Sequence, residues 1–235
     1  MPKGTLFLIP VPLAENSVDK VLTTWQSQLI NSLNIYIVEN EKTARYWLKV
    51  MGLKTAQSEL VIHGYGKHSD KTDISAYFKE LEEGKDVGLM SEAGCPAIAD
   101  PGSDIVSEAH RRGIRVSPMV GPSSILLALM ASGFNGQSFT FHGYLPIDKA
   151  QRSKRIKELE SVSEKLRQTQ IFIETPFRNN HLLEDILKAC QSRTRLCVAC
   201  NLTAGDEQII SMPVEQWRRQ KTDFHKKPAI FLLMR

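Results

Sequence analysis

The sequence has 235 residues, of which 42% are hydrophobic and 24% are charged, and its formal net charge is +4. This length allows one large domain or two small ones, and the composition is typical of a soluble globular protein. No run approaches the about 18 uncharged apolar residues of a membrane-spanning helix, and the N-terminal segment lacks the cleavage site of a signal peptide. We therefore expect a cytoplasmic protein with no membrane partner.

Charge is distributed unevenly between the two halves of the chain. Residues 1–117 carry 13 Lys and Arg against 15 Asp and Glu, a net charge of −2, whereas residues 118–235 carry 17 against 11, a net charge of +6. Such asymmetry is compatible with a polyanionic partner for the second half. Ordinary solvated faces explain the charge equally well.

Apolar runs of strand length recur along the chain and alternate with stretches of helical spacing. Strands are expected within residues 5–11, 34–40, 86–92, 114–120, 171–175, 195–201, 208–214 and 229–235. Helices are expected over Val18–Leu33, Thr43–Leu53, Asp73–Glu83, Asp104–Arg112, Ser123–Ala131 and Asn180–Ala189. This alternation predicts an α/β fold with mostly parallel or mixed sheets. Pro and Gly cluster in 117–121, so we expect two α/β domains, 1–117 and 118–235.

The four cysteines include one C-x-x-C pair, Cys197 and Cys200. The pair lies in a strand-like run, where residues three apart point to opposite faces, and no second pair or His cluster completes a tetrahedral metal site. The sequence predicts buried strand cysteines and no metal.

Small residues, Pro and Gly gather where several predicted strands end. Pro10 stiffens the end of the first strand. The third strand is followed by SEAGCPAIADPGS, a long loop without the Gly pattern of a dinucleotide or phosphate site. Its small residues allow close backbone approach to a ligand, although an elaborate structural loop explains them as well. Ser103 is a plausible N-cap for the helix that follows.

Two later motifs also have both a ligand-binding and a structural interpretation. Ser123 and Ser124 lie near a helix N-terminus, where they either contact a ligand carboxylate or cap the helix. Glu174 and Arg178 are four residues apart and can pair in the first turn of a helix.

In order, these segments resemble the tetrapyrrole methylase superfamily, the class III S-adenosylmethionine (SAM) methyltransferases. The resemblance rests on IPVP, SEAGCPAIADPG, GPSSILLALMASG, FHGYLP, IFIETPFR with LLEDIL, and NLT. The closest likeness is to the branch that methylates the 2′-hydroxyl of a cytidine ribose in small-subunit ribosomal RNA. The resemblance implies two α/β domains with SAM in the cleft between them, and a homodimer.

The same resemblance implies a set of cofactor contacts. They are Pro10, Met90, Ser91, Glu92, Ala93, Gly94, Ile98, Ser123, Ser124, Leu202, Pro228 and Ala229. The chain departs from the branch at four places: LAENS replaces Gly-Asn-Leu, residues 39–42 replace Glu-Asp-Thr-Arg, residues 200–203 replace Arg-Glu-Leu-Thr, and residues 226–228 replace Lys-Gly-Glu. All four lie in segments expected near the cleft or the substrate, so the prediction of the cofactor is firmer than that of the substrate.

Candidate catalytic and RNA-binding residues follow from this interpretation. A ribose hydroxyl is a poor nucleophile that benefits from a general base, and we expect Glu39 or Lys42 to shape the substrate side. Arg152, Lys154 and Arg155, in a basic segment, are candidate phosphate contacts, although a solvated helix explains them too. Phe177 either stacks a base or lies in the interior, the commoner fate of an aromatic side chain.

Two alternatives to an RNA methyltransferase stay open. One is a methyltransferase for a tetrapyrrole or another small molecule. The other is a SAM-binding protein that has lost catalysis, which the changes at residues 40–42 and 200–201 allow.

Overall fold

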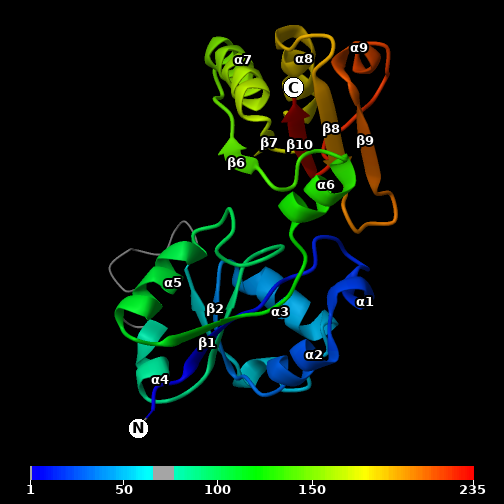
Figure 1. The fold of residues 1–235 in the computed structure, drawn as a ribbon. Helices are drawn as coiled ribbons and strands as arrows, with labels where there is room; N and C mark the ends of the chain where they lie inside the picture. Colours follow the sequence, from blue (N-terminus) through cyan, green and yellow to red (C-terminus); the bar gives the residue numbers. More distant parts are fainter. Residues whose placement is uncertain (1, 66–76) are drawn as a thin grey trace. The chain divides into compact units, whose positions relative to one another are not determined.

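The computed structural model describes residues 2–65 and 77–235 of the chain. They form two compact units, Met1–Ser123 and Ser124–Arg235, which are coloured from blue to green and from green to red in Figure 1. The boundary expected from the Pro and Gly cluster, after residue 117, falls inside the last strand of the first unit. Each unit is built on a five-stranded sheet of its own.

The first unit contains a parallel sheet. Its strands are β1 (Thr5–Leu8), β2 (Ile35–Val38), β3 (Val61–Gly64), β4 (Val87–Met90) and β5 (Arg115–Pro118), in the order β3-β2-β4-β1-β5. Every pairing in this sheet is parallel. The carboxyl ends of the strands therefore meet at one edge, where open α/β sheets bind their ligands.

Helices flank this sheet and bury its alternating side chains. They are α1 (Val18–Val21), α2 (Thr24–Ile30), α3 (Glu41–Val50), the 3₁₀ turn η1 (Gln57–Glu59), α4 (Lys79–Glu82) and α5 (Gly102–Arg111). Tyr36 packs in the cluster that includes Trp47 and Leu48 of α3. Its neighbour Ile37 packs in the cluster that includes Leu81 and Ile105, because successive strand residues point to opposite faces.

The second unit contains a mixed sheet. Its strands are β6 (Phe139–Tyr144), β7 (Thr169–Ile173), β8 (Arg195–Cys200), β9 (Gln208–Pro213) and β10 (Ala229–Met234), in the order β6-β7-β10-β8-β9. Only β6 and β7 are parallel, and the other three pairings are antiparallel. The prediction of an α/β fold with parallel and mixed sheets is confirmed.

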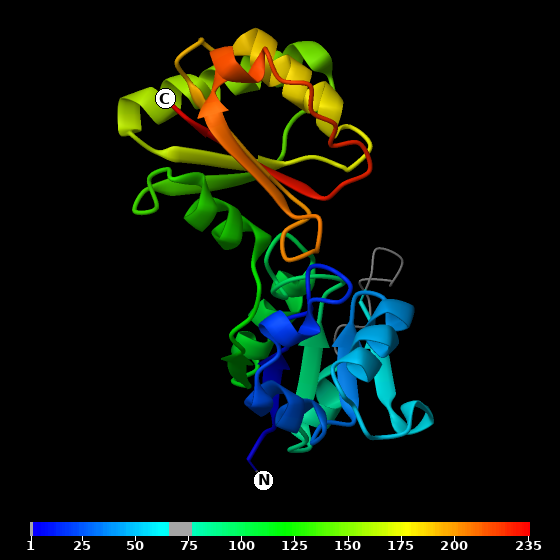
Figure 2. The ribbon, with the colours of Figure 1, turned by 90° about the vertical axis from the view of Figure 1, so that its right-hand side faces the viewer.

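Three long helices and one short helix cover this second sheet. They are α6 (Ser124–Ser132), α7 (Lys149–Leu166), α8 (Asn179–Ala189) and α9 (Val214–Trp217). Figure 2 shows α7 and α8 on one side of the sheet and α6 on the other. The core beneath α7 and α8 includes Ile156, Ile186 and the stacked rings of Phe172 and Phe231.

Several predicted boundaries differ from those of the structure for local chemical reasons. The expected helix over Val18–Leu33 is two helices, because Thr23 caps α2: its hydroxyl accepts from Gln26 N–H, while Gln26 Oε1 accepts from Thr23 N–H. The expected N-cap at Ser103 is wrong. The N–H of Gly102 instead donates to Asp100 Oδ1 (2.6 Å), and the helix begins at Gly102. Residues 73–76 of the expected helix over Asp73–Glu83 lie outside the described part of the chain.

Candidate functional site

The candidate site of the first unit lies at the carboxyl edge of its parallel sheet. Pro10 follows β1 and is buried, and Met90, at the end of β4, is fully buried. The N–H of Ile9 donates to Leu89 O, and the N–H of Glu39 donates to Met90 O. These bonds continue the strand ladder beyond β1 and β2, so that Pro10 and Glu39 project from the same edge.

The long loop after β4 is tied to the end of β1. Val11 and Gly94 exchange both backbone hydrogen bonds, at 2.8 and 2.9 Å. Gly94 has a φ of +76°, a left-handed conformation that glycine adopts without steric cost. Gly121, from the segment after β5, lies against Pro10, where an added Cβ would be 2.1 Å from Pro10 Cβ. Three segments far apart in sequence therefore converge.

Backbone geometry gives the distal part of this loop its fixed shape. Ala97 and Ala99 have φ values of +66° and +62°, which cost free energy for non-glycine residues. Asp100 holds the turn, because its Oδ1 accepts the N–H groups of Ala97 (3.0 Å) and Gly102 (2.6 Å). Ile98 lies between the two strained alanines and is 55% exposed. The loop thus presents an apolar side chain on a rigid support.

Two acidic residues, Glu39 and Glu92, lie at the centre of the edge, where the side chain of the first binds the backbone of the second. Glu39 Oε2 accepts the N–H of Glu92 at 3.3 Å, and Glu92 Oε1 accepts the hydroxyl of Thr43 at 3.4 Å. Ser91 is buried and donates to Ala93 O, whereas Glu92 and Ala93 are exposed. This arrangement fits SAM, because carboxylates attract a cationic sulfonium and accept from ribose hydroxyls.

A buried tyrosine lies beneath these acids. Tyr65 donates to Met90 O at 3.4 Å. Burial first, and then the negative charges of Asp100 and Glu39, raise the pKa of Tyr65, so it stays a neutral donor. Burial also raises the pKa of Asp100, even though the N–H groups that it accepts act in the opposite direction. Tyr65, Thr43 and Asp100 are absent from the predicted set; the only sequence signal was the position of Asp100 before Pro-Gly.

The other predicted residues of the first unit lie on the segments around this edge. Lys42 is exposed in the first turn of α3, which Asn40 caps by accepting the N–H of Thr43 at 3.1 Å. Ser123 is half-buried after the segment that carries Gly121. The structure thus brings Glu39, Glu92 and the small-residue loop together, with Lys42 three residues beyond Glu39.

In the second unit, three of the four predicted cofactor residues lie together at one end of its sheet. Ser124 is half-buried at the start of α6. Leu202 is buried just after β8, and Ala229 opens β10, where it pairs with Cys200. The N–H of Asn201 donates to Pro228 O at 3.0 Å. Leu202, Pro228 and Ala229 are thus neighbours, as a shared role requires.

The expected phosphate contact by Arg152 is corrected. Its side chain is 10% exposed and donates to Asp185 Oδ2 from Nε (2.9 Å) and Nη2 (2.6 Å), and its Nη1 donates to Pro146 O and Ile147 O. Every nitrogen of this guanidinium is engaged inside the unit. The expectation arose because Arg152 lies in a basic run of the sequence. In the structure, Arg152 lies on the buried side of α7.

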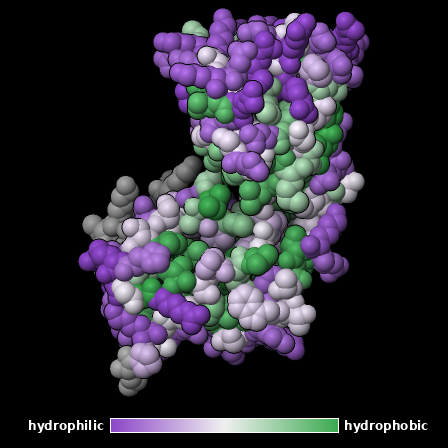
Figure 3. Space-filling view, viewed as in Figure 1, coloured by the Kyte–Doolittle hydropathy of each residue, from purple (hydrophilic) through white to green (hydrophobic). Residues whose placement is uncertain are grey.

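The remaining predicted RNA contacts lie on or near the surface of α7. Lys154 is exposed, whereas Arg155 is half-buried and pairs with Glu158 at 3.3 Å. The surface over α7 and α8 is mainly hydrophilic (Figure 3). These observations agree with a solvated helix and leave Lys154 available to a phosphate.

Both cysteines of the C-x-x-C pair are buried, as predicted. Cys197 and Cys200 lie in β8, and burial raises the pKa of Cys197 to about 11. Within residues 2–65 and 77–235, no group of three or more His, Cys, Asp or Glu is placed to hold a metal ion. The helices of these same residues are too short or too polar to cross a bilayer.

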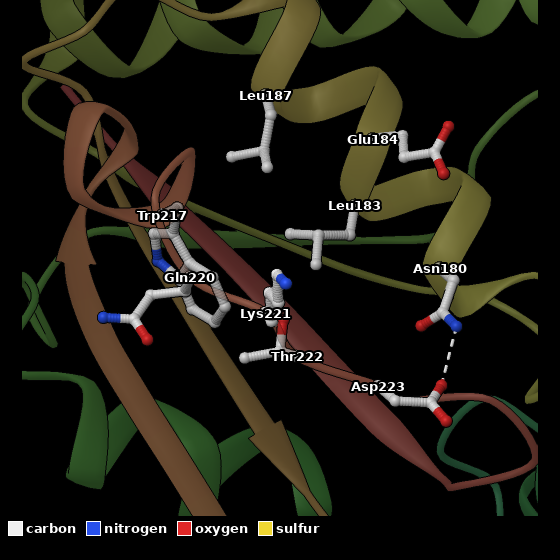
Figure 4. A pocket seen from close by; sticks show the side chains of 9 residues that line it. All are labelled: Asn180, Leu183, Glu184, Leu187, Trp217, Gln220, Lys221, Thr222 and Asp223. Atoms are coloured by element: carbon white, nitrogen blue, oxygen red, sulfur yellow. Dashed lines mark hydrogen bonds between the residues drawn. The ribbon is translucent and has the colours of Figure 1, made fainter.

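The second unit also has an open pocket of about 460 Å³ between α8 and residues 217–223 (Figure 4). Leu183 and Trp217 form its apolar floor, and Asn180 Nδ2 donates to Asp223 Oδ1 across one end at 2.7 Å. None of the predicted cofactor residues lines it.

Fold and site together define a two-unit α/β protein that carries a small-residue loop and two acidic residues, Glu39 and Glu92, at the carboxyl edge of a parallel sheet. Residues 37–217 match the family of Tetrapyrrole (Corrin/Porphyrin) Methylases. The chain therefore belongs to this family, and it is a SAM-dependent methyltransferase.

Individual relatives agree with this assignment. The chain is 29% identical to the Vibrio cholerae protein named ribosomal RNA small subunit methyltransferase I, over 100% of the chain and 78% of that protein. It is 31% identical to the protein of the same name from Halalkalibacterium halodurans, over 94% and 73%.

Solved structures share the fold at low sequence identity. The methyltransferase CobJ superposes with a TM-score of 0.64 at 15% identity, covering 100% of this chain and 94% of that one. The Thermus thermophilus uroporphyrin-III C-methyl transferase, complexed with S-adenyl homocysteine, gives 0.60 at 14% identity, covering 98% and 97%.

Proposed function

We propose that this protein transfers the methyl group of SAM to a ribose 2′-hydroxyl in small-subunit ribosomal RNA. The observation that carries the proposal is the likeness, along nearly the whole chain, to proteins named ribosomal RNA small subunit methyltransferase I. The basic second half of the chain and the exposed Lys154 of α7 support a polyanionic substrate.

The chain's own residues account for cofactor binding in this proposal. The predicted contacts in the first unit are Pro10, Met90, Ser91, Glu92, Ala93, Gly94, Ile98 and Ser123; those in the second are Ser124, Leu202, Pro228 and Ala229. SAM supplies an electrophilic methyl group. The interlocked Val11–Gly94 and Pro10–Gly121 contacts support a binding edge that is rigid before the cofactor arrives, which lowers the entropic cost of alignment.

Glu39 is the better placed of the two candidate catalytic residues. Its carboxylate lies at the carboxyl edge of the sheet and already accepts the N–H of Glu92. In our proposal, a ribose oxygen attacks the methyl carbon while the carbon–sulfur bond breaks, and Glu39 takes the hydroxyl proton. The exposed ammonium of Lys42 holds the neighbouring phosphate of the substrate.

A methyltransferase for a tetrapyrrole or another small molecule is the second candidate. The solved structures that share the fold include CobJ and uroporphyrin-III C-methyl transferase, but at 14–15% identity they establish the fold alone. The four departures from the RNA branch motif are the observation that favours this candidate. Loss of catalysis with retention of SAM binding is the remaining alternative.

Labelled-methyl transfer separates these possibilities. Small ribosomal subunits from a strain that lacks this gene and its close relatives are incubated with the protein and labelled SAM. We expect label in one 2′-O-methylated nucleotide, located by nuclease digestion and mass spectrometry. SAM binding measured in the same mixture without any transfer would reject the RNA substrate and redirect the search to small molecules.

Two further features belong to the proposal. We expect a homodimer, which sedimentation velocity tests, and a cytoplasmic location, which cell fractionation tests. A monomer at micromolar concentration would contradict the first expectation.

A further inference from the structure

Phe177 is an exposed aromatic residue on a rigid support. The expectation that it lies in the interior is wrong, because 63% of the residue is exposed. It follows β7 in a short turn, where the N–H of Arg178 donates to Thr175 O at 2.9 Å. Arg178 also donates from Nε to the buried Glu174 at 3.0 Å. The turn is thus held from both sides of Phe177.

A second segment, residues 223–227, brings a histidine ring and a lysine ammonium to this ring. The ring of His225 lies edge-on to that of Phe177, with centroids 5.9 Å apart and an interplanar angle of 76°. Lys226 Nζ lies 6.0 Å from the centroid of Phe177, at the outer limit of a cation–π contact. We call Phe177, His225 and Lys226 the Phe177 platform.

Hydrogen bonds fix this second segment against α8 and the Phe177 turn. The N–H of Lys226 donates to Pro176 O at 2.9 Å. The buried Asn179 donates from Nδ2 to Lys227 O at 2.7 Å. Asn180 binds Asp223 Oδ1 through Nδ2 (2.7 Å, Figure 4) and accepts the N–H of Phe224. Phe224 is fully buried against Trp217 and anchors the segment.

The charges around the platform favour an anionic partner. Lys226 and Lys227 both lie beside the turn that carries the ring, and Lys226 is exposed to solvent. Of the acids on the same segments, Glu174 pairs with Arg178. Asp223 accepts from the neutral side chain of Asn180 and from the N–H of His225, so it stays charged, but Lys226 and Lys227 outnumber it. An exposed ring with adjacent cations matches the needs of a nucleotide, since bases stack on aromatic rings and phosphates bind cations.

We infer that the Phe177 platform stacks a base of single-stranded RNA and that Lys226 binds the adjoining phosphate. The inference rests on the proposed function and adds a binding surface to it. Pro228, a predicted cofactor contact, lies only two residues after Lys226. A base held on the platform therefore places its strand beside the predicted cofactor residues of the second unit.

The test compares Phe177→Ala, Phe177→Trp and the control Tyr144→Ala, which removes a ring of similar exposure (61%) from β6. Fluorescence anisotropy measures binding to naked single-stranded fragments of small-subunit RNA, and calorimetry measures SAM binding. We expect Phe177→Ala to weaken RNA binding about 5- to 100-fold, the loss of one stacked base. Phe177→Trp and Tyr144→Ala should bind RNA within about twofold of the wild type, and SAM affinity should not change in any variant.

Three outcomes would overturn the inference, and they are distinguishable. Equal RNA binding by the wild type and Phe177→Ala rejects the platform and leaves the proposed function intact. Loss of binding to assembled small subunits, with naked RNA binding unchanged, shows that the platform contacts a ribosomal protein instead. A wild type that binds SAM but neither naked RNA nor subunits rejects both the platform and the RNA substrate.

Discussion

Arg152 of α7 and Asp185 of α8 form a buried ion pair in which two guanidinium nitrogens bind one carboxylate oxygen, at 2.6 and 2.9 Å. Their side chains are 10% and 5% exposed. The same guanidinium donates to the carbonyls of residues 146 and 147, which precede α7. This pair therefore joins two helices and the loop before one of them.

Removal of Arg152 should destabilise the second unit. Because Arg152→Met leaves the Asp185 carboxylate buried and unpaired, we expect a loss of about 3–5 kcal/mol in the free energy of unfolding. The change Lys154→Met, on the exposed side of the same helix, should cost less than about 0.5 kcal/mol. Urea denaturation followed by circular dichroism measures both. Equal stability of the two variants would show that the ion pair does not stabilise the fold.

The local order of elements can largely be read from the sequence, but the use of individual side chains cannot. Apolar runs predict eight of the strands that the structure contains, whereas they miss β3 and β6, whose short runs include His63 and His142. Spacing along the chain does not show which side of α7 is buried, so the sequence places Arg152 at the surface. Phe177 shows the opposite error: its hydrophobic ring favours the interior, but hydrophobicity alone does not reveal that the local turn holds this ring in solvent.

The sequence predicts the binding loop of the candidate site, but it does not predict which side chains contact the acids and the strand ends beside that loop. The segment SEAGCPAIADPG is long and rich in small residues, and these two features alone mark it as a candidate binding loop. Thr43 and Tyr65 lie far from that loop in sequence and meet Glu92 and Met90 only through the parallel order of β2, β3 and β4. Their participation depends on topology, which a single sequence leaves open.

Gly121→Ala should disturb the convergence of the loop segments. An added Cβ would be 2.1 Å from Pro10 Cβ and 2.3 Å from Pro10 Cγ, and the rigid proline ring cannot rotate away. We expect a loss of about 1–3 kcal/mol in stability, together with weaker SAM binding. Gly64→Ala is the control, because a Cβ there would meet no atom of residues 2–65 and 77–235 within 4 Å. Thermal denaturation with and without SAM distinguishes the two variants, and identical curves would contradict the close packing.

His142 should make the second unit less stable in mild acid. Its Nδ1 faces a guanidinium nitrogen of Arg155, which can only donate, so Nε2 carries the hydrogen that is donated to Gln170 Oε1 at 2.7 Å. Burial lowers the pKa of His142 from its usual 6.5, the hydrogen bond with Gln170 acts in the opposite direction, and the charge of Arg155 lowers the pKa further. Below about pH 6.5 the unfolded chain binds a proton that the native chain does not, so stability falls as pH falls toward the native pKa.

The measurement is the urea midpoint of the wild type and of His142→Gln between about pH 5 and 8. We expect the difference between the two proteins to be constant above about pH 7 and to shift in favour of the variant as the pH falls, since glutamine stays neutral. Parallel curves over the whole range would show that His142 does not contribute to the acid sensitivity.

Glu39 at the sheet edge leads to the most direct catalytic prediction. Glu39→Gln keeps an acceptor for the N–H of Glu92, which the wild-type carboxylate binds at 3.3 Å, but it removes the proposed base. We expect turnover on small ribosomal subunits to fall by about 10²-fold or more.

Lys42→Ala should also lower turnover, while SAM affinity stays within about threefold of the wild type, because the ammonium is assigned to the substrate. Lys49→Ala, exposed at the other end of α3, is the matched control and should leave both quantities unchanged. If Lys42→Ala turns over at the wild-type rate, its substrate role is rejected; if Glu39→Gln does so, the proton must leave by another route.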